Sequence, residues 1–177
     1  MEDQRLSKLY KMLPEIEALV FDRTQADVVY AAALAARIKR DGFETLSPAE
    51  RDEWNNMLKG RYTDKDLNRV EAAVQALSDL LKEYYYSAPV ETKTNWVHPD
   101  IPGAAEMERY LNNIKTLIGA FFVLPNTPSL PESTERLTFG RANDIERILY
   151  DIANTIPKVA AASRYSGTFY SGQAGLR

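Results

Sequence analysis

The sequence has no cysteine and only one histidine, His98, among its 177 residues. Without cysteine, the chain can form neither a disulfide nor a thiolate metal site. Any Ser-His-Asp arrangement would depend on His98, which lies in a proline-flanked stretch that is poorly suited to hold a base. A zinc site would have to combine His98 with carboxylates alone, which is an unusual ligand set. We therefore expect no metal and no cofactor.

Long apolar runs and an excess of basic charge are also missing. No window of about 18 uncharged apolar residues occurs, so we expect no membrane span. The start, MEDQRLSKLYKML, lacks the pattern of a secretory signal. The net charge of -3, with no basic cluster, argues against a nucleic-acid partner. There is no glycine-rich phosphate loop, and Gly42 and Gly60 each follow a predicted helix and are expected to be C-caps.

Acidic residues are plentiful, and some share a helical spacing. Glu50 with Glu53, or Asp144 with Asp151, could form the acid pair of a small hydrolase. Solvated helix faces require the same residues, and this simpler interpretation is the one we adopt. We predict no catalytic residue and no enzymatic activity.

The sequence does contain clear signals for helix starts and for amphipathic helices. Thr24 with Asp27, Ser47 with Glu50 and Thr63 with Asp66 have the spacing of capping boxes, and Pro48 suits a first helical position. Apolar residues then recur at helical spacing. The apolar positions are Leu6, Leu9, Leu13, Ile16 and Val20; Val28, Ala31, Ala35 and Ile38; Leu67, Val70, Val74, Leu77, Leu81 and Tyr84; Met107, Tyr110, Ile114, Leu117 and Phe121; and Ile145, Ile148, Ile152 and Val159.

These patterns predict an all-α, bundle-like fold of about five to six helices. We divide the chain into an amphipathic helix over 1–20 that is interrupted at Pro14, a helical domain over 21–163, and an irregular tail over 164–177 that is rich in Tyr, Gly and Ser. Pro157 is expected to kink or end the last helix. The connection over 87–102 should begin extended, because Pro89 and Pro99 disfavour helix before them.

Two further patterns leave alternatives open. Pro125, Pro128 and Pro131 have polyproline II spacing, typical of a stiff surface strut and less often of a ligand for an aromatic groove. Three helix starts place an acid three residues before an arginine, at intervals of about 40 residues. They are Asp66 with Arg69, Glu106 with Arg109, and Asp144 with Arg147. A repeat would give this pattern, but so would shared helix chemistry, which we favour.

The aromatic residues outside the helical seams are candidates for binding. Trp96 and Tyr85 could stack on a sugar ring, although for Trp96 we favour a position that caps the core where a helix end meets the connection. Tyr165, Phe169 and Tyr170 belong to a Gly/Ser segment that cannot bury them alone, so we expect them at a protein interface. The same expectation applies to Leu6, Leu9 and Leu13.

Several ordered segments carry a resemblance to a known family. They are FDRTQADV from Phe21, DLNRVE from Asp66, VETKTNW from Val90, EMERYLNNIK from Glu106, LPNTPSLP from Leu124 and RYSGTFYSG from Arg164. Together they resemble a helical domain of prophage tail and minor structural proteins of Gram-positive gut bacteria. The likeness runs from about Phe21 to Gly172.

This resemblance implies a non-enzymatic virion component, associated with a tail or baseplate and built from several copies. Its partners would be other copies of itself and other phage structural proteins, and it would assemble in the bacterial host cytoplasm. The alternative is a receptor-binding module of a phage tail that recognises a host surface glycan through Trp96 and Tyr85.

Overall fold

The computed structural model describes residues 13–98 and 100–166, and within these ranges it is helical with no strand. The prediction of an all-α fold is confirmed. The elements are α2 (Pro14–Glu17), α3 (Gln25–Asp41), the 3-10 helix η1 (Phe43–Thr45), α4 (Pro48–Asn56), α5 (Asp64–Glu83), α6 (Ala104–Ala120) and α7 (Phe139–Ser166).

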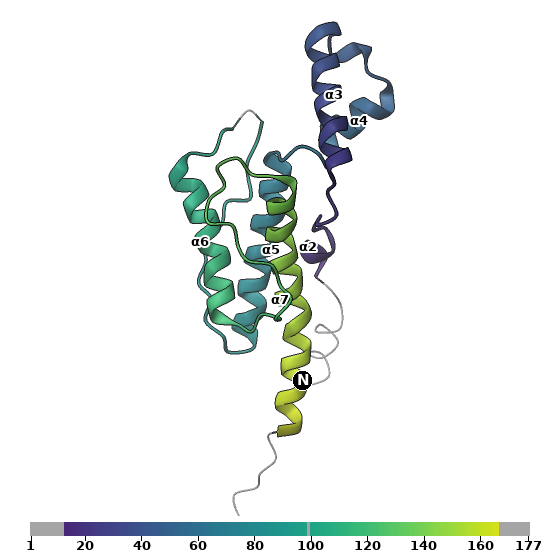
Figure 1. Cartoon of the computed structure of the whole chain (residues 1–177). Helices are drawn as coiled ribbons and strands as arrows, with labels where there is room; N and C mark the ends of the chain where they lie inside the picture. Colours follow the sequence, from purple (N-terminus) through teal and green to yellow (C-terminus); the bar gives the residue numbers. More distant parts are fainter. Residues whose placement is uncertain (1–12, 99, 167–177) are drawn as a thin grey trace, which may run out of the picture.

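Helices α5, α6 and α7 form a bundle in which all three run in the same direction (Figure 1). Near their starts, Arg109 of α6 bonds Glu71 of α5, and Arg69 of α5 bonds Glu146 of α7. Near their ends, the rings of Tyr86 and Phe121 pack edge to face. Parallel neighbours require each connection to travel back along the bundle. This explains why the segments over 84–103 and 121–138 are so long.

The apolar seams predicted for these three helices form the main core. Leu77, Leu81, Ile114, Ile145 and Ile148 are fully buried. Ile16 and Leu19 from the N-terminal segment and Ala88 and Trp96 from the first connection join the same cluster. The core is therefore completed by two segments outside the three long helices.

The N-terminal segment departs from the helix predicted over 1–20. In its described part, only Pro14–Glu17 is helical, and residues 18–24 are irregular. Ile16 and Val20 are buried as expected, while Leu13 is half-buried. The helix ends early because the Val20 N–H donates to the Glu146 carboxylate of α7, which draws the chain away from a helical path.

Helices α3 and α4 form a hairpin that projects from the bundle (Figure 1). The hairpin has an apolar cluster of its own, built on Ala31, Leu34, Leu46 and Leu58. We expected Ala35 in this face, but Ala35 is exposed and Leu34 is buried instead. The alanines lie all around α3, so its apolar pattern does not mark one face.

The N-caps predicted for three helix starts are present. Thr24 and Ser47 each form a complete capping box. In the third box, the Asp66 carboxylate accepts the Thr63 N–H at 2.7 Å. Gly42 ends α3 with φ of 94°.

Gly60 is not the C-cap we predicted, because α4 ends at Asn56. A Cβ on Gly60 would lie 2.0 Å from the Asp27 carbonyl oxygen, so this position lets the return segment of the hairpin pass against the start of α3.

Pro157 does not end the last helix, because α7 continues through it to Ser166. Ile152 and Ile156 are buried on the bundle side and hold this part of α7 in place. Residues 164–166, which we assigned to the irregular tail, are therefore helical, and the rest of that predicted tail, 167–177, lies outside the described residues. The proline-rich connection crosses the bundle between α6 and α7, with Leu130 packed on the core and Thr127 bonded to Asp151 at 2.8 Å.

Candidate functional site

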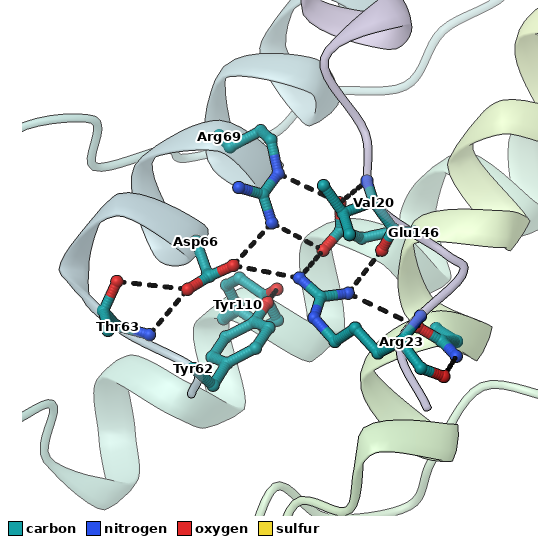
Figure 2. Close-up of polar contacts among 9 residues, drawn as sticks. Val20, Arg23, Tyr62, Thr63, Asp66, Arg69, Tyr110 and Glu146 are labelled. Atoms are coloured by element: carbon teal, nitrogen blue, oxygen red, sulfur yellow. Dashed lines mark hydrogen bonds and ion pairs between the residues drawn. The ribbon is translucent and has the colours of Figure 1, made fainter. Parts of the chain in front are cut away.

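The most distinctive polar feature is a buried ionic cluster of Arg23, Asp66, Arg69 and Glu146 (Figure 2). The Arg23 Nη2 lies 2.9 Å from Asp66 Oδ1 and 2.7 Å from Glu146 Oε1. The Arg69 Nη2 lies 2.6 Å and 2.9 Å from the same two oxygens. Each of the four side chains is at most 10% exposed. Two cations and two anions compensate each other, so the cluster carries no net charge.

The cluster joins three segments that are distant in sequence. Asp66 and Arg69 lie on the first turns of α5, and Glu146 lies on α7. Arg23 comes from the irregular link between α2 and α3. This link is fixed twice more, because the Arg23 N–H donates to Asn143 Oδ1 at 3.1 Å and Asn143 Nδ2 donates to the Arg23 carbonyl at 2.9 Å. The Arg23 guanidinium also donates to the Val20 carbonyl.

Burial acts against the charge on Arg69, but the acceptors Glu146 and Asp66 more than offset it, and the net effect raises the pKa of Arg69. Arg69 therefore stays charged. A carboxylate held between two guanidiniums has its lone pairs occupied, so this arrangement suits a structural clamp better than proton transfer.

Below the cluster, Tyr62 and Tyr110 share a hydrogen bond, with their hydroxyl oxygens 2.7 Å apart. Burial raises the pKa of both phenols well above the ordinary value. The Arg23 guanidinium carbon lies 5.5 Å from the centre of the Tyr62 ring, within the range of a cation–π contact. Both hydroxyls stay neutral and join the hairpin's return segment to α6.

A second polar cluster fixes the connection over 84–103. Glu71 of α5 is 1% exposed and accepts from Arg109 of α6, with Nη2 to Oε1 at 2.6 Å. The same carboxylate accepts the Lys93 N–H at 2.9 Å. Asn68 exchanges two 2.8 Å hydrogen bonds with the backbone of Trp96. The hydrogen bond to Glu71 raises the pKa of Arg109.

Of the three acid–arginine pairs predicted at the helix starts, one forms between the two predicted residues. Asp66 bonds Arg69. Arg109 instead pairs with Glu71, and Arg147 pairs with Asp151. The helix starts therefore use the same residue types in different ways, which agrees with shared helix chemistry.

The two candidates for a sugar platform do not form a single surface. Trp96 is 3% exposed and the Lys93 ammonium lies over its ring, 3.5 Å from the ring centre, so Trp96 occupies the core position that we favoured. Tyr85 is 90% exposed and follows the end of α5. The Trp96 backbone is bonded to Asn68, near the start of α5. Trp96 is thus unavailable for stacking.

Other residues singled out in the sequence lie apart or outside the described chain. Leu6, Leu9, Phe169 and Tyr170 are outside the described residues, as is the side chain of Tyr165. His98 is exposed on the rim of a groove of about 490 Å³ between α5 and α6, near Asp100 and Met107.

Acidic residues that we considered as catalytic pairs accept hydrogen bonds from nearby side chains or backbone. Glu50 accepts from Ser47 and Arg37, Glu53 accepts from the Tyr30 hydroxyl, and Asp151 accepts from Arg147.

Within residues 13–98 and 100–166, no group of three or more histidine and acidic side chains is arranged to hold a metal ion. In the same ranges, none of the helices has the length and apolar character needed to cross a membrane. Comparison with family models, curated proteins and solved structures finds no match to this chain.

Proposed function

We propose that this chain is a non-enzymatic structural component of a phage virion, associated with the tail or baseplate and assembled through contacts between copies. The sequence resemblance to prophage tail and minor structural proteins, from about Phe21 to Gly172, supports a place in the virion. The observation that carries the assembly role is the projecting α3–α4 hairpin, whose outer helix presents small apolar side chains to solvent.

One exposed stripe of α3 consists of Ala26, Val29, Ala33 and Ala36, at intervals of three and four residues, and Val29 is 60% exposed. Hereafter we call these four residues the α3 face. Such small side chains allow two helix backbones to approach closely. The partner we propose is the same face of a second copy, because identical faces related by a twofold axis are self-complementary.

The ionic cluster supports this role by fixing the base of the hairpin. Arg23 precedes Thr24, the N-cap of α3, and its bonds to Asp66 and Glu146 connect the hairpin to α5 and α7. Gly60 lets the return segment pass against Asp27 at the start of α3. A projecting element that carries a subunit contact must keep its orientation, and these two features provide that.

Sedimentation of the purified full chain tests the contact. We expect a concentration-dependent dimer or larger species that Ala33→Asp abolishes. Ala35→Asp is the matched control, because Ala35 is also exposed but lies roughly 200° around the helix from Ala33. A monomer at all concentrations, or equal loss with both variants, would contradict the role of the α3 face.

The virion setting has a separate test. Antibody labelling and electron microscopy of phage particles induced from the encoding bacterium should locate the chain on the tail or baseplate. Its absence from purified particles would overturn this part of the proposal. Glycan-array binding by the isolated chain would favour the receptor-binding alternative, which the burial of Trp96 disfavours.

A further inference from the structure

A groove lies beside the short helix α2, along the outward side of α5, with a volume of about 630 Å³. Its apolar lining includes Ala72, Ala76 and Leu80 of α5. Its acidic residues are Glu15, Asp79 and Glu83. Leu13, the first described residue, also lines it.

We propose that residues 1–12 of the same chain occupy this groove, with Leu6 and Leu9 on its apolar lining and the basic side chains Arg5, Lys8 and Lys11 beside its acids. This inference is independent of the proposed function. It gives Leu6 and Leu9 an intramolecular role, in place of the subunit contact expected from the sequence.

Position is the first argument. Leu13 lines the groove, so no linker separates it from residues 1–12 in the sequence. Leu13 has an extended backbone, with φ of -65° and ψ of 137°, and Pro14 begins α2. Because Leu13 is extended, residues 1–12 need not continue along the axis of α2. They can instead run along α5.

Length is the second argument. The groove follows α5 from Ala72 to Glu83, a span of about 16 Å at the rise of an α-helix. Twelve residues in a helix would cover about 18 Å by the same rise. The segment and the groove therefore match in length.

Charge is the third argument. The segment has three basic residues, Arg5, Lys8 and Lys11, against the acids Glu2 and Asp3 near its far end. Among the described residues, Glu15 and Glu83 have no recorded ion-pair partner, and Asp79 accepts only from Gln75, at 3.1 Å. Opposite charges around an apolar contact favour this occupant, and the direct tether gives it a high effective concentration over any free partner.

The absence of cysteine makes a disulfide test clean, because a designed pair is the only one the chain can form. In the full chain, we would combine Leu9→Cys with Ala76→Cys and oxidise mildly. The matched control combines Leu9→Cys with Lys115→Cys, since Lys115 is exposed on α6. Non-reducing electrophoresis and peptide mapping would identify the product.

We expect rapid formation of a cross-linked monomer with Ala76→Cys and little with Lys115→Cys. Adding Asp79→Lys and Glu83→Lys should slow cross-linking several-fold, and Lys8→Glu with Lys11→Glu should restore it. A disulfide-linked dimer would show that a second copy fills the groove and would overturn the proposal. No cross-link, or equal rates with both pairs, would overturn it as well.

Discussion

Arg23 and Glu146 lie 123 residues apart in the chain, yet the Arg23 Nη2 is 2.7 Å from Glu146 Oε1 inside the protein. This ion pair, shared with Asp66 and Arg69, connects the base of the hairpin to two helices of the bundle. A buried pair of this kind need not add net stability, but losing one partner leaves an uncompensated charge.

We therefore expect Arg23→Met to destabilise the protein by about 3–5 kcal/mol, the range for removing one partner of a buried ion pair. Arg40→Met is the control, because the Arg40 side chain is 72% exposed and pairs with its neighbour Asp41. Its removal should cost less than about 1 kcal/mol. Urea denaturation followed by circular dichroism measures both. Equal effects would show that the cluster does not hold the fold.

The helical seams lead to a second prediction. Leu77→Ala and Ile114→Ala should each destabilise by about 2–5 kcal/mol, because both side chains are fully buried and leave a cavity. Val97→Ala, at a position that is 59% exposed, should stay within about 0.5 kcal/mol of wild type. Thermal unfolding of the three variants decides the matter, and shifts of similar size would argue against the core assignment.

Gly60 provides a third prediction. Gly60→Ala should destabilise the protein, because the new Cβ would lie 2.0 Å from the Asp27 carbonyl oxygen and force two backbone segments apart. Gly119→Ala is the opposite case. Gly119 lies in α6 with nothing within 4 Å of its Cβ position, so alanine should stabilise by roughly 0.5–1 kcal/mol. We expect the unfolding midpoint to fall in Gly60→Ala and to rise in Gly119→Ala. An unchanged midpoint in Gly60→Ala would contradict the close approach of residue 60 to Asp27.

Glu50 gives a prediction about pH. The Arg37 guanidinium, together with the Ser47 N–H and hydroxyl, lowers the pKa of Glu50 from 4.5 to about 2. A lowered folded-state pKa means that this contribution to stability is complete above the unfolded pKa and is lost as pH falls from about 4.5 toward about 2. Carboxyl-carbon NMR titration should show a low midpoint for Glu50.

Arg37→Met tests the cause of that shift, because it removes the largest lowering interaction and should move the Glu50 midpoint upward. Arg51→Met is the control, since Arg51 pairs with Glu44 and not with Glu50. An unchanged midpoint in Arg37→Met would rule out the guanidinium as the main cause.

Local chemistry explains why much of the fold could be predicted. The cap at Thr24 and the seam around Leu77 depend on residues within a few positions of one another, and both are present in the structure. The face of α3 was assigned incorrectly at Ala35, because a helix with alanine on every side has no distinctive apolar stripe.

The ionic cluster could be anticipated only in part. Asp66 and Arg69 are three residues apart, so helical spacing predicts their pairing. Arg23 and Glu146 carry no such signal, because their contact depends on how the helices are ordered in space. The sequence likewise contains nothing local that makes α5, α6 and α7 parallel.

That parallel arrangement has a consequence for how quickly the protein reaches its native state. The contact of Arg69 with Glu146 spans 77 residues, and that of Val20 with Glu146 spans 126. Each requires a long loop to close before any packing compensates the lost chain entropy. An antiparallel bundle of similar size makes most of its contacts between sequence neighbours and folds fast for that reason. This protein should fold more slowly than such a bundle, with α7 joining only after most of the chain has been made.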